Sequence, residues 1–220
     1  TLLLYVFIDK IRINRSATST VGNRFLKIKK FILPLSHYYL NMKLQSIAVF
    51  CGSKNGINPV YSEHAALLGT LLARHQIKLV YGGGSAGLMG VIADSVMQQG
   101  GEVMGFIPRL LLEWEVQHRG ITELIICDDM HERKKRIYSV SDAAVVLPGG
   151  FGTLDELFEI VTWNQLTIHD KHIYILNSAG FYDHLVAHLA LMKKEGFLYE
   201  EAIKRITVIN HPEELIPFLT

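Results

Sequence analysis

The chain has 220 residues, of which 49% are hydrophobic and 20% charged, enough for one sizeable core and a single domain. Its formal net charge of +1 gives no overall reason to expect a nucleic-acid partner. The two cysteines, Cys51 and Cys127, form no CxxC motif or disulfide framework, which suits a reducing compartment, and we expect a cytoplasmic protein.

Residues 1–41 differ in composition from the rest of the chain. They carry seven Lys or Arg residues against one acid, Asp9, and the first methionine, Met42, directly precedes a strand pattern. The apolar run at 1–8 is too short to span a bilayer, so no membrane partner is expected. The basic, acid-poor composition would also fit a transit peptide. We interpret 1–41 as a leader outside the fold and 42–220 as one domain.

From Met42 onward, short apolar segments alternate with segments of helical periodicity. Strands are predicted at 44–51, 77–84, 102–108, 123–127, 143–148, 172–177 and 206–209. Helices are predicted at 58–76, 87–101, 130–141, 153–167 and 180–196, with a loop or short helix at 109–121 and a last element at 211–219. In the first helix Asn58 is the expected N-cap, followed by Pro59. Its expected apolar face consists of Ala66, Leu67, Leu71 and Leu72.

This alternation of strands and helices predicts an α/β fold. Near-continuous apolar strands are typical of a doubly wound parallel sheet covered by helices on both faces, giving three layers, α/β/α. In such sheets ligands bind at the carboxyl ends of the strands, near a topological switch point. Because two glycine-rich turns follow predicted strands, we expect both turns to contribute to one site.

The first turn, "YGGGSAGLMG" at 81–90, has three consecutive glycines before a helix. Glycines such as Gly83 and Gly84 permit positive φ and let backbone N–H groups approach a ligand, while the helix start adds partial positive charge. The same glycines would also serve a sharp strand-to-helix turn without any ligand. The turn lacks the Gly-Lys-Ser/Thr of a Walker loop and does not fit a dinucleotide fingerprint convincingly.

The second turn, "PGGFGT" at 148–153, repeats this arrangement. Thr153 is an expected N-cap, and Glu156 stands three residues later, the spacing of a capping box. Glu156 could therefore either cap the helix or take part in a reaction. Together the two turns suggest a nucleotide-sized ligand, with one turn at a phosphate and the other near a sugar.

A basic helix is predicted between the two turns, with Asp128 or Asp129 near its N-cap. In most proteins such a run of basic residues lies on a solvent-facing side of its helix. The start of this helix, however, follows a strand and so lies at the same edge of the sheet as the two glycine-rich turns. Arg133 carries a planar fork of donors suited to phosphate or sugar oxygens. We expect no metal, because no His, Cys and carboxylate cluster has ligand spacing, and no serine hydrolase, because no Gly-x-Ser-x-Gly elbow occurs.

The segments "CGS" (51–53), "GGGSAGLMG" (82–90), "MHERK" (130–134) and "PGGFGTLDE" (148–156) resemble, in order and spacing, those of the LONELY GUY family. Its members are cytokinin riboside 5′-monophosphate phosphoribohydrolases, historically mislabelled as lysine decarboxylases. The resemblance covers about residues 44–218. It implies a Rossmann-like fold, a homodimer, no cofactor, and hydrolysis of a nucleoside 5′-monophosphate to free base and ribose 5-phosphate. Some bacterial members act on AMP, so an AMP nucleosidase-like activity is also implied.

The resemblance also implies roles for individual residues. Arg133 and Glu156 would be the catalytic pair, and Lys134 would lie beside the substrate. The turn at 150–153 would hold the phosphate end, with Thr162 further along its helix in the pocket wall. The implied substrate-binding residues are Glu115, Lys134, Gly83, Gly84, Gly149, Gly150, Phe151, Gly152, Thr153 and Thr162. Lys54 stands where the family often has Ser, and it would either contact the nucleotide or face water.

Breaking an N-glycosidic bond develops positive charge on the sugar, as in glycosidase transition states. Glu156 could stabilise that charge or activate water, and a neighbouring Arg133 would keep it ionised and oriented. Asp155 points about 100° round the helix and is expected to face solvent or the helix dipole. The alternative function is a non-catalytic nucleotide-binding or carrier protein, for which Arg133 and Glu156 would not meet in a pocket. A decarboxylase would need a pyridoxal-phosphate lysine in a strand–loop context, for which there is no signature.

Overall fold

The computed structural model describes residues 44–112, 117–199 and 203–219. By its internal contacts the chain divides into Thr1–Met42 and Lys43–Thr220, and every described residue belongs to the second unit. The predictions for 1–41 therefore lie outside the described residues. Within the described ranges no helix is both long and apolar enough to cross a bilayer.

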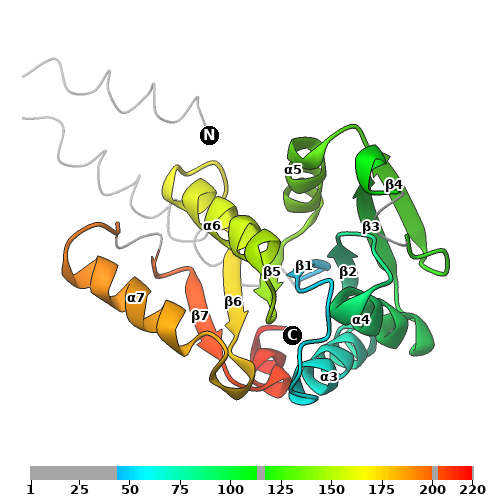
Figure 1. Ribbon diagram of the computed structural model, residues 1–220, viewed down its shortest axis with the longest axis horizontal. Coiled ribbons are helices and arrows are strands. Elements are labelled where there is room, and N and C mark those ends of the chain that lie inside the picture. The colour runs from blue at the N-terminus through cyan, green and yellow to red at the C-terminus, as the bar shows by residue number, and fades with distance from the viewer. Residues whose placement is uncertain (1–43, 113–116, 200–202, 220) are drawn as a thin grey trace, which may run out of the picture. The chain divides into compact units, whose positions relative to one another are not determined.

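The centre of the unit is a parallel sheet of seven strands in the order β4-β3-β2-β1-β5-β6-β7 (Figure 1). The strands are β1 Ser46–Phe50, β2 Lys78–Tyr81, β3 Val103–Pro108, β4 Glu123–Cys127, β5 Ala143–Val146, β6 His172–Leu176 and β7 Ile206–Ile209. The first strand, β1, lies in the middle of the sheet, and β2, β3 and β4 follow in order toward one edge. The next strand, β5, lies on the other side of β1, and β6 and β7 continue to the opposite edge. The predicted doubly wound, Rossmann-like sheet is confirmed, and its switch point lies between β1 and β5.

Helices cover both faces of the sheet and give the predicted three layers (Figure 1). They are α3 Val60–Arg74, α4 Gly87–Gln98, α5 Met130–Val140, α6 Phe151–Gln165 and α7 Asp183–Lys194, with the short 3-10 helices η3 Arg109–Leu111, η4 Ser178–Gly180 and η5 Pro212–Phe218. Alternate strand residues face opposite layers: Ile47 and Val49 pack with α3 and α4, whereas Ala48 and Phe50 pack with α5 and α6. The core thus consists of two apolar clusters, one on each face.

One local prediction was wrong in part, and the last predicted element is confirmed. Leu71 and Leu72 of the predicted apolar face of α3 are buried, but Ala66 and Leu67 are only partly buried, and Ala65 and Leu68 are fully buried in their place. This helix packs closely on α4 and η5, and those tertiary contacts decide which side of the apolar run is buried. The element predicted at 211–219 is the 3-10 helix η5.

The segment that follows β1 is tied to both glycine-rich turns. The N–H of Gly52 donates to the carbonyl of Pro148 at 3.0 Å, and the N–H of Leu88 donates to the carbonyl of Gly52 at 3.1 Å. Three segments therefore meet at the carboxyl ends of β1, β2 and β5, the edge where ligands bind in this class of sheet.

Candidate active site

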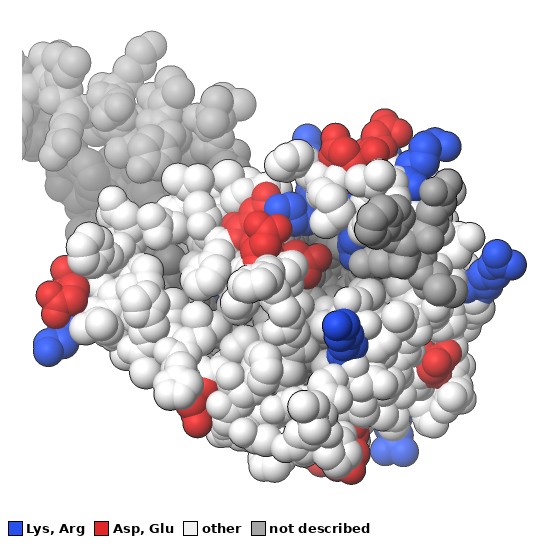
Figure 2. Space-filling view, viewed as in Figure 1, with Lys and Arg blue, Asp and Glu red and all other residues white. Residues whose placement is uncertain are grey.

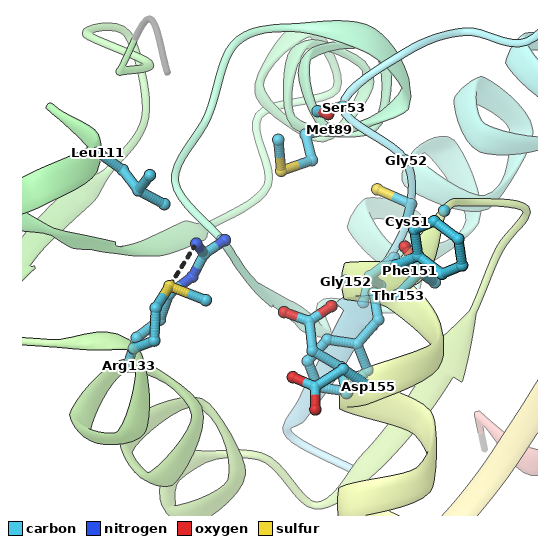
Figure 3. A pocket seen from close by; sticks show the side chains of 16 residues that line it. Cys51, Gly52, Ser53, Met89, Leu111, Arg133, Phe151, Gly152, Thr153 and Asp155 are labelled. Carbon is cyan, nitrogen blue, oxygen red and sulfur yellow. Dashed lines mark hydrogen bonds between the residues drawn. The ribbon is translucent and has the colours of Figure 1, made fainter. Parts of the chain in front are cut away.

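A cavity of about 260 Å³ lies at this edge of the sheet, between α5 and α6 (Figure 3). Its walls come from the segment after β1, the first glycine turn, α4, η3, α5 and the start of α6. The lining residues are Val49, Phe50, Cys51, Gly52, Ser53, Gly82, Met89, Leu111, Met130, Arg133, Gly150, Phe151, Gly152, Thr153, Asp155 and Glu156. The predicted pair, Arg133 and Glu156, is brought together in this cavity.

Arg133 occupies the first turn of α5, whose start is well capped. The carboxylate of Asp129 accepts from the N–H of Glu132 at 2.8 Å, and the carboxylate of Glu132 accepts from the N–H of Asp128 at 2.6 Å. Asp129 is therefore the N-cap, one of the two predicted candidates. Arg133 is only 5% exposed, and its Nη1 approaches the sulfur of Met130 at 3.8 Å, as the dashed line in Figure 3 shows. The capped helix start fixes the point from which the guanidinium enters the cavity.

Glu156 lies in the second turn of α6. Its carbonyl accepts a hydrogen bond from the hydroxyl of Tyr138 on α5 at 2.9 Å. Burial, with the nearby carboxylates of Glu156, Glu159 and Asp155, raises the pKa of Tyr138, so this hydroxyl remains a donor. The contact ties the backbone beside Glu156 to the helix that carries Arg133.

The capping box predicted for Thr153 and Glu156 is wrong. Helix α6 begins at Phe151, two residues earlier than predicted, and Gly150 is its N-cap in an extended conformation without a described side chain as cap. Thr153 is consequently inside the helix and buried. Glu156 is too far along the helix for a capping role, which leaves it available for chemistry.

Lys134, next to Arg133, points to the adjacent helix instead of the cavity. Its Nζ lies 3.0 Å from a carboxylate oxygen of Asp155 and 2.8 Å from one of Glu159, and it is not among the described residues that line the cavity. Burial lowers the pKa of Lys134, but the hydrogen bonds to Glu159 and Asp155 outweigh burial and raise it. In Figure 2 acidic and basic side chains lie side by side in the region where Figure 1 places the facing parts of α5 and α6.

Asp155 differs from its predicted role. It is 61% exposed, as a solvent-facing residue would be, yet it pairs with Lys134 and also lines the cavity. Asp155 and Glu159 are four residues apart and therefore lie on one face of α6, the face toward Lys134 of α5. Together they hold this buried lysine between the two helices.

The residues of the second turn that were predicted to bind substrate divide into two groups. Gly150, Phe151, Gly152 and Thr153 line the cavity, and Phe151 is 94% exposed at its mouth. Gly149 borders a neighbouring cavity of about 370 Å³, which Lys54 also lines. The structure thus places most of this turn, but not Gly149, around the cavity of Arg133 and Glu156.

Other predicted residues lie away from this cavity. Gly83 has a φ of +79° and accepts from the N–H of His118 at 2.9 Å, while Gly84 pairs with Gln117 in an isolated bridge. Thr162 donates to the carbonyl of Phe158 at 2.6 Å and lines a separate apolar groove between α6 and α7. Glu115 lies outside the described residues.

Some lining residues were not predicted to act in the site. The first glycine turn reaches the cavity through Gly82, not through Gly83 or Gly84, and Met89 and Met130 are also in its wall. Gly82, Met89 and Met130 all stand inside the quoted motifs, which is the signal that could have identified them. Cys51 also lines the cavity, but burial, reinforced by Glu156 and opposed by Arg133, raises the pKa of its thiol. That thiol is protonated at neutral pH and is a poor nucleophile.

The site therefore offers one cation and two carboxylates at a helix start, and its described lining residues include no histidine. Across the described ranges, no three His, Cys, Asp or Glu side chains gather closely enough to hold a metal ion. The carrier hypothesis required Arg133 and Glu156 to lie apart, and they share a cavity.

Comparison with known proteins gives matches over most of the chain. A family described as "Possible lysine decarboxylase" matches residues 89–219. The probable cytokinin riboside 5′-monophosphate phosphoribohydrolase LOGL1 of Oryza sativa subsp. japonica is 44% identical over 170 residues, 77% of this chain and 76% of that protein. The cytokinin riboside 5′-monophosphate phosphoribohydrolase LOG1 of Arabidopsis thaliana is 42% identical over 177 residues, 80% of this chain and 83% of that protein.

Solved structures share the fold at lower sequence identity. The molybdenum cofactor binding protein of Rippkaea orientalis superimposes with a TM-score of 0.62 at 21% identity, covering 81% of this chain and 97% of that one. The molybdenum cofactor carrier protein of Chlamydomonas reinhardtii gives a TM-score of 0.60 at 18% identity, covering 79% and 94%. At these identities the similarity establishes the fold alone.

Proposed function

The chain belongs to the LONELY GUY family, and on that premise we propose that it hydrolyses the N-glycosidic bond of a cytokinin riboside 5′-monophosphate. The products are the free base and ribose 5-phosphate. The observation that carries this proposal is the shared cavity of Arg133 and Glu156, which come from neighbouring helices. The curated relatives named for this activity match more than two thirds of the chain.

In the proposed complex the phosphate lies at the start of α6. The first N–H groups of a helix have no partner within the helix and carry partial positive charge, so they suit an anion. Gly150 and Gly152 leave the approach open, since a Cβ at either position would meet no heavy atom of the described residues within 4 Å. Glu156 lies four residues beyond Gly152, about 6 Å along the helix axis. That distance lets one helix hold the phosphate and present a carboxylate to the ribose.

The proposed reaction replaces the bond from the anomeric carbon to the base nitrogen by a bond to a water oxygen. As the base leaves, positive charge develops on the ribose. Glu156 stabilises this charge and accepts a proton from the attacking water, while the departing base takes up a proton at its nitrogen. Arg133 orients Glu156 and hydrogen-bonds oxygens of the substrate.

The wall of the cavity supports an apolar substituent on the base. Away from the start of α6, Leu111 and Met130 line it, and Met130 is exposed. Apolar side chains of this kind favour an N6-isoprenoid group, because its burial removes apolar surface from water. We propose a preference for the prenylated nucleotide over AMP, with an AMP nucleosidase-like activity as the weaker reaction.

One assay tests the function and the preference. The protein is incubated with isopentenyladenosine monophosphate and, separately, with AMP, and free base is separated by chromatography. We expect release of base from both nucleotides, faster from the prenylated one, and far slower release with Glu156→Gln. Recovery of both nucleotides intact would favour the carrier hypothesis, and equal rates would contradict the proposed preference.

We also propose that the protein acts as a homodimer in the cytoplasm. The family resemblance implies the dimer, and exposed apolar side chains along α6, Phe158 and Leu166, provide a surface for it. Two buried free cysteines suit a reducing compartment. Light scattering of the purified protein tests the dimer, which a mass of one chain across micromolar concentrations would contradict.

A further inference from the structure

Gly82 is the residue at which the first glycine turn touches the cavity. We propose that Gly82 is a positioning residue for the reaction, and that its missing side chain leaves the space in which the guanidinium of Arg133 lies. This inference rests on the proposed function, because Arg133 acts there on the substrate. It assigns to Gly82 a role distinct from the backbone turn and from direct contact with the phosphate.

The steric evidence is specific to one side chain. A Cβ built on Gly82 would lie 1.9 Å from Nη2 of Arg133 and 3.0 Å from its Cζ. The next nearest atom is the sulfur of Met89, at 3.4 Å, an ordinary contact distance. Of the three atoms nearest to such a Cβ, only the two of the guanidinium lie closer than an ordinary contact, so an alanine at 82 would displace the guanidinium first.

Backbone conformation does not explain this glycine. Gly83 and Gly87 have φ values of +79° and +60°, in the left-handed region that favours glycine. Gly82 is not among the glycines with positive φ, so an alanine could adopt its backbone conformation. The space needed by Arg133 is the remaining reason for a glycine at this position.

The base of the arginine side chain is held in place, so the clash must be relieved by movement of its guanidinium end. It is 5% exposed, it leaves a helix whose start is fixed by Asp129, and its Nη1 contacts Met130. A Cβ at 82 would force the guanidinium away from Gly82 while the helix stays in place. Because a misplacement of about 1 Å at a reacting centre can reduce a rate by about a hundredfold, the effect on turnover should be large.

The test is Gly82→Ala in the full chain. We expect kcat with isopentenyladenosine monophosphate to fall about a hundredfold, and kcat/KM to fall equally, since the displaced group acts in the transition state. The thermal midpoint should stay close to that of the wild type, because the atom that must move is the end of a flexible side chain. A crystal structure of the variant should show the guanidinium moved from its place above residue 82.

The matched control is Gly69→Ala. A Cβ on Gly69, in α3, would lie 2.8 Å from the carbonyl oxygen of Ile92 and 2.8 Å from Cβ of Ser95 in α4. This variant should lose thermal stability and keep the wild-type kcat, the reverse of Gly82→Ala. An unmoved guanidinium, an unchanged kcat, or a Gly82→Ala thermal midpoint as low as the control's would each overturn the proposal. If the wild type itself releases no base, the proposed function fails, and the crystal structure still decides whether Gly82 positions Arg133.

Discussion

The turn at 81–90 and the turn at 148–153 follow different strands of one sheet, and each leads into a helix at the same edge. In the first turn protein atoms fill the space above the glycines: a Cβ on Gly82 would meet Arg133, and one on Gly87 would lie 2.3 Å from the backbone of Lys54. In the second turn Gly149 is also crowded, since a Cβ there would lie 2.1 Å from Oγ1 of Thr153, but a Cβ on Gly150 or Gly152 would meet no described heavy atom within 4 Å.

This difference separates two uses of glycine that look alike in sequence. The first turn lets other parts of the protein come close, namely the guanidinium and the segment after β1. The second leaves its backbone N–H groups accessible to a ligand at the start of α6. We therefore infer that the first turn organises the catalytic cation and the second receives the anionic end of the substrate.

The largest expected effect comes from removing the carboxylate that the second turn presents. Glu156→Gln should lower kcat by about 10²–10⁴, the usual contribution of a general base, with little change in KM or thermal stability. Steady-state kinetics with isopentenyladenosine monophosphate measure this loss. Asp155→Asn is the control, and it should reduce kcat far less, because Asp155 shares its role at Lys134 with Glu159. A greater loss of kcat from Asp155→Asn than from Glu156→Gln would mean that Asp155, not Glu156, is the catalytic carboxylate.

The next effect distinguishes the two turns directly. Gly150→Ala should weaken binding of ribose 5-phosphate about tenfold and leave kcat nearly unchanged, because the added methyl group crowds the approach to the helix start without touching a described side chain. Calorimetric titration with ribose 5-phosphate measures the affinity. Gly82→Ala should show the opposite pattern, with kcat reduced and affinity kept. Identical patterns for the two variants would remove the distinction between the turns.

The sequence was sufficient for the fold because strands and helices are encoded locally. Apolar runs such as 143–146 and the acidic cap at Asp129 depend on neighbouring residues only, and the structure confirms both. The start of α6 was misplaced because Thr153 and Glu156 have the spacing of a capping box, whereas the helix begins two residues earlier with Gly150 as its N-cap. The buried face of α3 was misplaced because α4 and η5, not the helix itself, select it.

The site was predictable to the extent that motifs mark it. Arg133 and Glu156 were named from the resemblance, and the structure places them in one cavity. The sequence could not show that Gly82, and not Gly83 or Gly84, reaches that cavity. What distinguishes Gly82 is its contact with Arg133, which is distant in the sequence and comes close only in the folded chain. Nor could it show that Lys134 pairs with two acids of another helix, since residues 21 or more positions apart meet only in the folded chain.

A smaller effect is expected between the two helices that carry the proposed catalytic pair. Lys134→Met should reduce the free energy of unfolding by about 1–3 kcal/mol, because the charged hydrogen bonds to Asp155 and Glu159 are lost, and should lower kcat by loosening α5 against α6. Urea unfolding and kinetics measure the two effects. Lys135→Met, at the exposed neighbouring lysine, is the control and should change neither. A stable Lys134→Met variant with a raised KM would instead support the substrate contact that the family resemblance implies for Lys134.

The smallest effect is that of pH on the free energy of unfolding, and it should be the same for variants of either turn. Burial lowers the pKa of His64, His169 and His172 from the ordinary value of 6.5. Below about pH 6.5 these imidazoles are therefore protonated in the unfolded chain but still neutral in the folded chain. The free energy of unfolding decreases as the pH falls from 6.5 toward the pKa values of the folded state. At pH 7.5 these imidazoles are neutral in both states and have no such effect.

The free energy of unfolding in urea should accordingly be lower at pH 5.5 than at pH 7.5. None of the three histidines is among the described residues lining the cavity, so Gly82→Ala and Gly150→Ala should show the same decrease as the wild type. His64→Asn should show a smaller decrease, because it removes the imidazole buried against Ser178 at 2.7 Å. Stability that is constant or higher at pH 5.5 would contradict the argument, and a decrease confined to one glycine variant would mean that its turn is coupled to a titrating group.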